Sequence, residues 1–126
     1  MQIRIYYEDT DCGGIVYHAN YLKFAERARS ELFFARGMKP EVGGYSFVVR
    51  NIQARFLAPA KLGDLVWVGA IPIEIRGASL KLLQEVRLGD AEGKELALLE
   101  VEVVCLKEGK VARIPEDFYS LFGEQE

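Results

Sequence analysis

One change of hydrophobic period divides the sequence and limits the folds open to it. From Asn20 to Arg36, apolar residues recur every three to four positions, which predicts an amphipathic helix. Gly37 and Pro40 follow and are typical of a helix end. The expected apolar face comprises Tyr21, Phe24, Ala25, Ala28, Leu32 and Ala35.

After this helix, every apolar segment is strand-like. Two strands after the helix show this most clearly. In one, an apolar row alternates with Lys81, Leu83, Glu85 and Arg87, and the row consists of Leu80, Leu82, Val86 and Leu88. In the other, one face consists of Leu99, Val101, Val103 and Cys105. The expected strands cover residues 2–7, 46–57, 64–75, 80–88 and 96–106, with turns at Pro59 to Gly63, Gly77-Ala78 and Asp90 to Gly93 and a helical turn at 115–122. The strands follow too closely for crossover helices, so we expect an α+β fold with an antiparallel sheet.

Composition narrows the class of protein. The chain has 126 residues and a net charge of -3, so we expect one domain over residues 1–126 and no nucleic-acid partner. No signal peptide and no transmembrane segment is recognisable, which predicts a cytoplasmic protein. Cys12 and Cys105 are isolated and His18 is the one histidine, so we expect no metal site.

The stretch from Glu8 to Tyr21 carries the chemistry. The sequence contains no GxSxG elbow, which argues against a serine hydrolase. It also contains no GxxxxGK[ST] loop and no GxGxxG, which argues against the common nucleotide phosphate loops. Asp11 and the pair Gly13-Gly14 lie just before the helix instead. The first N–H groups of a helix have no partner within it and can bind a carbonyl oxygen on which charge develops. A carboxylate beside them can attack that carbonyl or activate a water, which predicts acyl transfer.

Four motifs then point to a family. They are Tyr7 to Asp11, Gly14 to Tyr21, Glu26 to Arg29, and Phe56 to Ala60 with Gly63-Asp64. In these motifs the sequence resembles the hotdog-fold acyl-CoA thioesterases of the YbgC and 4-hydroxybenzoyl-CoA thioesterase family. The order of the expected strands agrees over essentially the whole chain.

The resemblance implies a long central helix wrapped by a roughly five-stranded antiparallel sheet. It also implies dimers joined edge to edge through the sheet, often paired into homotetramers, with active sites at subunit interfaces and no cofactor beyond the CoA of the substrate. Asp11 takes the position of the catalytic nucleophile or general base. The backbone amide of His18 takes the position of the group that polarises the thioester carbonyl, and the His18 imidazole is counted as catalytic in the YbgC branch.

Further residues are expected to bind the substrate. Tyr17 and Tyr21 are expected to shape the acyl pocket, with packing of the helix as the alternative. The resemblance places Tyr7 beside the site, with a place in the core as its alternative, and Gly14 is expected to let the backbone approach the substrate closely. In the family, polar contacts to the CoA nucleotide fall near Arg76, Ser79 and Lys81, which equally suit an ordinary exposed hairpin.

Two neighbouring groups have a structural interpretation. Asp9 is expected to be a turn residue before the helix. Glu26 and Arg29 are expected to form an ion pair on the helix surface. Cys12 lies beside Asp11, and a thiolate nucleophile there is the weaker alternative.

Two other functions remain open. One is a dehydratase acting on β-hydroxyacyl thioesters, although the segment Glu8 to Asp11 does not match its usual loop. The other is a module that binds acyl-CoA or an acyl carrier protein without turnover. The acyl group itself is not predicted.

Overall fold

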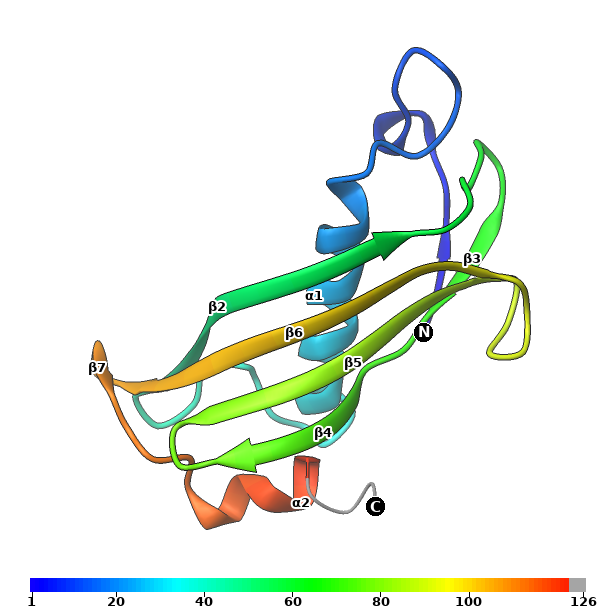
Figure 1. Ribbon diagram of the computed structural model, residues 1–126. Helices are drawn as coiled ribbons and strands as arrows, with labels where there is room; N and C mark the ends of the chain where they lie inside the picture. The colour runs from blue at the N-terminus through cyan, green and yellow to red at the C-terminus, as the bar shows by residue number, and fades with distance from the viewer. Residues whose placement is uncertain (123–126) are drawn as a thin grey trace.

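Helix α1 (Asn20–Phe34) lies across one face of a curved antiparallel sheet in the computed structural model, which describes residues 1–122 (Figure 1). The expected α+β arrangement is therefore confirmed. The helix begins at the predicted residue but is not long, because it ends after 15 residues and the chain turns at Gly37, whose φ is +74°. At 1.5 Å per residue it spans roughly 20 Å, about half the length of the 13-residue strand β6.

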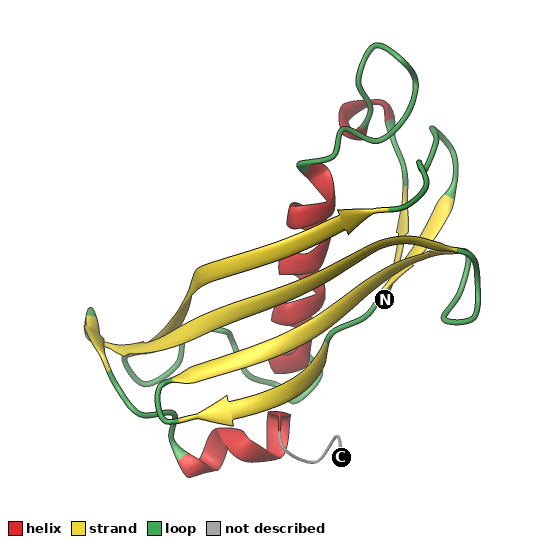
Figure 2. Ribbon diagram, viewed as in Figure 1, coloured by secondary structure: helices red, strands yellow, loops and turns green. Residues whose placement is uncertain are grey.

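Over residues 1–122 the sheet has seven strands rather than roughly five. They are β1 (Gln2–Arg4), β2 (Tyr45–Phe56), β3 (Leu65–Val68), β4 (Ile71–Arg76), β5 (Ser79–Leu88), β6 (Glu95–Lys107) and β7 (Lys110–Val111). Five of them follow one another in the order β1-β3-β5-β6-β2, while β4 pairs with β5 and β7 pairs with β6 (Figure 2). The predicted hairpin turns at Gly77-Ala78 and at Asp90 to Gly93 are confirmed.

Two predicted strands are shorter than expected. The segment 64–75 breaks into β3 and β4 at Gly69, where a Cβ atom would lie 2.6 Å from the Trp67 ring. Both pieces still pair with β5, so the break bends one edge of the sheet. The first strand ends at Arg4 because the chain turns into a short 3-10 helix, η1 (Tyr7–Asp9).

The core fills the space between α1 and the inner faces of β5 and β6. The face from Leu99 to Cys105 is buried as predicted, and so are Leu80, Leu82 and Val86. Leu88 was expected in the same row but is 40% exposed at the last position of β5. Gln84 belongs to the same inward row and is completely buried. A polar residue is tolerated there because its side-chain amide is fully hydrogen-bonded.

The C-terminal segment closes one end of the core. The predicted helical turn is present as η2 (Glu116–Phe118) and α2 (Tyr119–Phe122). The Phe118 ring lies 6.2 Å from the Phe33 ring, 6.2 Å from Phe47 and 5.7 Å from Tyr45, measured between centroids. These rings join the end of α1, the start of β2 and the C-terminal segment.

Strand β2 forms a free edge of the sheet. In the described part of the chain it pairs with β6 alone, and most of its residues are exposed. Val48, Val49 and Phe56 are exposed large apolar side chains on it. An exposed apolar edge strand is a ready site for pairing with another strand.

Candidate active site

The loop that carries Asp11 is fixed by backbone hydrogen bonds. A bridge joins Thr10 to Val16, and Val16 N–H donates to the Ala60 carbonyl at 2.9 Å. At the tip of this loop the Asp11 side chain is exposed, and its Oδ1 accepts the Gly13 N–H at 2.9 Å. Gly14 follows with φ of +81°, a conformation that favours glycine. The loop therefore presents the Asp11 carboxylate at the surface with the backbone held beneath it.

Asp9 has the opposite environment although it is two residues away. Its side chain is 7% exposed and accepts hydrogen bonds from Tyr6 N–H at 2.9 Å and from Asn20 Nδ2 at 3.1 Å. It thus ties the η1 turn to the first residue of α1. The structural interpretation of Asp9 is confirmed.

The entrance to α1 offers an unused backbone donor. The first hydrogen bonds of the helix run from Asn20 N–H to Tyr17 O and from Tyr21 N–H to His18 O. Within residues 1–122, the His18 N–H donates to no protein acceptor. It is therefore free to bind an oxygen at the positive end of the helix.

Aromatic rings flank the His18 imidazole. Its centroid lies 4.6 Å from the Tyr17 ring and 5.7 Å from the Phe56 ring, which meets it edge to face. Phe56 is 48% exposed. Phe56 belongs to the motif Phe56 to Ala60 but was not predicted as a site residue, because its approach to His18 depends on the path of β2. That motif was the one feature of the sequence that could have identified Phe56 as a site residue.

Tyr21 and Tyr7 lie in contrasting surroundings. Tyr21 is 3% exposed, and its hydroxyl accepts the Ala60 N–H at 3.1 Å. Burial raises the pKa of the Tyr21 hydroxyl, a hydrogen bond from the Ala60 backbone opposes that shift, and Asp64 adds to it. Tyr7 is 80% exposed on η1. A contact of either residue with substrate stays a prediction, and Tyr21 packs in the core of this chain.

The three residues expected to contact CoA gather around the β4–β5 hairpin. Arg76 donates to Glu74 at 2.8 Å, and Lys81 Nζ lies 3.7 Å from the other oxygen of the same carboxylate. The Ser79 hydroxyl donates to the Arg76 carbonyl at 3.1 Å. Within one chain this hairpin lies far from the Asp11 loop, toward the opposite end of the sheet (Figure 1).

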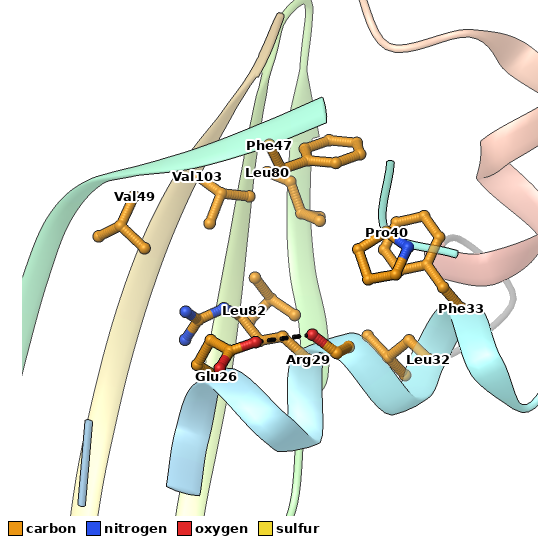
Figure 3. Close-up of a pocket in the computed structure, with 11 residues that line it drawn as sticks. Glu26, Arg29, Leu32, Phe33, Pro40, Phe47, Val49, Leu80, Leu82 and Val103 are labelled. Atoms are coloured by element: carbon orange, nitrogen blue, oxygen red, sulfur yellow. Dashed lines mark hydrogen bonds between the residues drawn. The ribbon is translucent and has the colours of Figure 1, made fainter. Parts of the chain in front are cut away.

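A cavity of about 140 Å³ separates the second half of α1 from the sheet (Figure 3). Its apolar wall includes Leu80, Leu82 and Val103 from the sheet, and Phe33 with Phe47 lies at one end. Its polar residues all come from α1 and are Glu26, Arg29 and Ser30, although Leu32 and Phe33 of the same helix also line it. The cavity is thus apolar toward the sheet and of mixed polarity toward the helix.

The expected surface ion pair between Glu26 and Arg29 is wrong. Arg29 turns inward and donates from Nη1 to Gln84 Oε1 at 2.9 Å, while Glu26 Oε2 accepts the Ser30 hydroxyl at 2.8 Å. Burial lowers the pKa of the Arg29 guanidinium, and the Glu26 carboxylate opposes that shift. The arginine turns inward because β5 offers it a buried acceptor.

Two further features bear on the kind of site. In the described residues, no three or more His, Cys, Asp or Glu side chains are grouped to hold a metal ion. Among the same residues, no helix has the length and apolar character needed to span a bilayer.

One helix laid across a curved antiparallel sheet, with an open donor at the helix entrance, defines a hotdog-fold protein. The family model of the thioesterase superfamily matches residues 13–95, and the chain belongs to that superfamily.

Several named proteins are similar to this chain in sequence or in structure. The chain is 49% identical to acyl-CoA thioesterase YbgC of Helicobacter pylori over 86 residues, or 68% of this chain and 65% of that protein. The match therefore spans just under two thirds of that relative. The chain is 41% identical to acyl-CoA thioester hydrolase YbgC of Escherichia coli O6:H1 over 109 residues, or 82% of this chain and 78% of the relative. A thioesterase from Thermus thermophilus, solved with coenzyme A and zinc, superposes with a TM-score of 0.86 at 28% identity, covering 100% of this chain and 92% of that one.

Proposed function

We propose that this protein hydrolyses acyl-CoA thioesters to a free acid and CoA. The observation that carries the proposal is the His18 N–H, which has no acceptor within residues 1–122 and stands at the start of α1 directly after the Asp11 loop. Such a donor stabilises the oxyanion that forms when a thioester carbonyl is attacked. The names of the relatives agree with this reaction.

Asp11 is proposed to supply the attack. Acting as a general base, its carboxylate takes a proton from water as the water oxygen bonds to the thioester carbon. The C–S bond then breaks and the electron pair leaves with the CoA sulfur. Acting as a nucleophile, the same carboxylate bonds to the thioester carbon, the C–S bond breaks as the CoA thiolate leaves, and water then hydrolyses the mixed anhydride to restore Asp11 and release the free acid. The thiolate of CoA is a good leaving group, so neither route needs a strong general acid.

The His18 side chain is proposed to assist. A helix N-terminus disfavours a positive charge, so the neutral ring is expected to donate a hydrogen bond or to position the water. The rings of Tyr17 and Phe56 limit its movement. Gly14 lets the substrate approach the backbone because no side chain intrudes.

The complete site is proposed to form between two copies of the chain. Strand β2 runs from Tyr45, beside the cavity end, to Phe56, beside His18. Two copies can pair antiparallel along this free edge, with the symmetry axis at the middle of β2. The end of β2 beside His18 in each copy then meets the end beside the cavity in the other copy. The same pairing brings Arg76, Ser79 and Lys81 of one copy toward Asp11 of the other.

The hairpin cations are proposed to bind the CoA phosphates. Both Arg76 and Lys81 already contact Glu74, so a phosphate must compete with that carboxylate. Their contribution to CoA binding is therefore expected to be moderate and to weaken with salt. A homodimer is the smallest assembly that the proposal requires, and homotetramers remain a prediction.

The test is thiol release from a panel of acyl-CoAs, with the products identified by mass and the assembly measured by sedimentation. Free acid and CoA, produced by a dimer or larger assembly and lost in Asp11→Asn, are the expected result. An intact enoyl thioester would identify a dehydratase. Binding without turnover, unaffected by Asp11→Asn, would identify a binding module. The same acyl groups on an acyl carrier protein test which carrier presents the substrate.

A further inference from the structure

Asn20, the first residue of α1, is a buried polar residue with no part in the proposed hydrolysis. Its side chain is 8% exposed, and its Nδ2 donates to Asp9 Oδ1 at 3.1 Å. The other oxygen of the same carboxylate accepts the Tyr6 N–H at 2.9 Å, so the start of η1 holds the acceptor in place. The position of Asn20 is therefore set by a contact from outside the helix.

The backbone of Asn20 orients the peptide group that carries the free donor. Its N–H donates to the Tyr17 carbonyl at 2.8 Å. That carbonyl and the His18 N–H belong to one planar peptide group, so a bond that fixes the oxygen also fixes the direction of the N–H. The side-chain anchor of Asn20 thus acts on the direction in which the His18 N–H points.

Asp9 also holds the chain on the other side of His18. The Tyr17 N–H donates to the Asp9 carbonyl at 3.0 Å. Asp9 therefore bonds through its backbone to the residue before His18 and through its carboxylate to the residue two positions after it. The two contacts leave the intervening turn little freedom to rotate.

Ala60 forms an outer pair of contacts around the same turn. Val16 N–H donates to the Ala60 carbonyl at 2.9 Å, and Ala60 N–H donates to the Tyr21 hydroxyl at 3.1 Å. All three residues are buried, whereas His18 is exposed. A buried frame thus holds positions 16, 17, 20 and 21, and the exposed histidine lies between them.

We propose that Asn20 is a positioning residue for thioester hydrolysis and that it aims the His18 N–H at the thioester carbonyl oxygen. The inference rests on the proposed function, because it concerns the donor that would stabilise the oxyanion. Asn20 acts through the peptide group of Tyr17 and His18 and does not touch the substrate. Hydrogen bonds weaken steeply when the donor is misdirected, so loss of the anchor should lower turnover more than substrate binding.

The first test is the kinetics of Asn20→Leu with butyryl-CoA or, if it is cleaved faster, benzoyl-CoA. We expect kcat to fall by about thirtyfold while KM stays within about twofold of the wild-type value. The matched control is Thr10→Val, which removes another side-chain hydrogen bond of the same loop, from the Thr10 hydroxyl to the Tyr7 carbonyl at 2.9 Å. This control should keep the wild-type kcat, because the lost bond does not hold the helix entrance.

Exchanging the two polar side chains tests the contact itself. Asn20→Asp alone places two carboxylates face to face and should lower kcat at least as much as Asn20→Leu. In the double variant Asp9→Asn with Asn20→Asp, the new amide can accept the Tyr6 N–H and donate to the new carboxylate. We expect kcat to return to within about threefold of the wild-type value, a coupling that a double-mutant cycle measures.

Infrared spectroscopy of a bound carbonyl separates this proposal from the proposed function. The probe is the ketone analogue of butyryl-CoA in which a methylene group replaces the sulfur, with carbon-13 at the carbonyl, and it cannot be hydrolysed. A stronger hydrogen bond lowers the stretching frequency of a carbonyl. We expect a lower frequency in the wild type than in Asn20→Leu, with the wild-type value restored in the double variant.

Circular dichroism and the melting temperature show which variants are folded, and Asn20→Ser replaces Asn20→Leu if the leucine variant does not fold. An unchanged kcat in the folded variant, or a rise in KM as large as the fall in kcat, would overturn the proposal. A folded double variant with no more activity than Asn20→Asp would also overturn it. The expected frequencies without any hydrolysis would support the positioning role and reject the thioesterase, whereas hydrolysis with equal frequencies would do the reverse.

Discussion

The loop that enters helix α1 and the helix itself meet the rest of the molecule in different ways. At its entrance, backbone hydrogen bonds fix the chain, from Val16 to Ala60 and from Tyr17 to Asp9, while the side chains of Asp11 and His18 stay exposed. Farther along, side chains make the contacts, and Arg29 bonds to the buried Gln84. Variants of the exposed side chains therefore report on chemistry, and variants of the buried contacts report on folding. A reactive group on a backbone-held loop can change without loss of the fold, whereas a buried side-chain contact cannot.

The largest effect is expected for Asp11→Asn. We predict a fall in kcat of about a thousandfold, because an amide neither attacks the carbonyl nor takes a proton from water. The melting temperature should not change, since the asparagine Oδ1 can still accept the Gly13 N–H. Steady-state kinetics and thermal unfolding measure both quantities. Retained turnover would exclude Asp11 as the catalytic carboxylate.

Asp9→Ala tests the buried carboxylate of the same loop, for comparison with the exposed Asp11. We predict a loss of about 2 kcal/mol in the free energy of unfolding, since Tyr6 N–H and Asn20 Nδ2 both lose their acceptor. Urea denaturation gives this value. Full stability combined with a loss of activity equal to that of Asp11→Asn would reverse the roles of the two acids.

His18→Ala tests whether the backbone or the side chain matters more at the helix entrance. The backbone N–H remains in this variant, so we predict a fall in kcat of about tenfold, equivalent to about 1.4 kcal/mol. A fall as large as that of Asp11→Asn would make the imidazole essential. An unchanged kcat would show that the His18 imidazole has no catalytic role and that the backbone amide is the group that acts.

The smallest effect concerns Tyr21 and is a dependence of stability on pH. Because burial raises the pKa of Tyr21 above its ordinary value, the folded chain keeps a proton that the unfolded chain releases above about pH 10. Stability is therefore complete below that pH and falls as the pH rises through the folded pKa. Urea unfolding at about pH 8 and about pH 11 should show a smaller loss in Tyr21→Phe than in the wild type. Tyr17→Phe is the control. An equal loss of stability between the two pH values in all three proteins would contradict the prediction.

The sequence predicted those parts of the fold that depend on local pattern. The start of α1, two hairpin turns and the inward rows of β5 and β6, apart from the exposed Leu88, were correct, because hydrophobic period and turn residues act over a few positions. The break at Gly69 was missed, since it depends on the position of the Trp67 ring. Strand β7 has two residues and carries too little pattern to predict.

In the candidate site, Asp11, Gly14 and His18 lie together at a helix entrance because they are neighbours along the chain, so their grouping could be predicted. The flanking of His18 by Phe56, the inward turn of Arg29 to Gln84 and the cavity beneath α1 became visible only in the folded chain. These contacts join residues 38 and 55 positions apart, and a hydrophobic period does not report which distant partner a side chain will meet. Helix and strands could be read from local spacing, but the direction of a single arginine depended on the packing of the helix against the sheet.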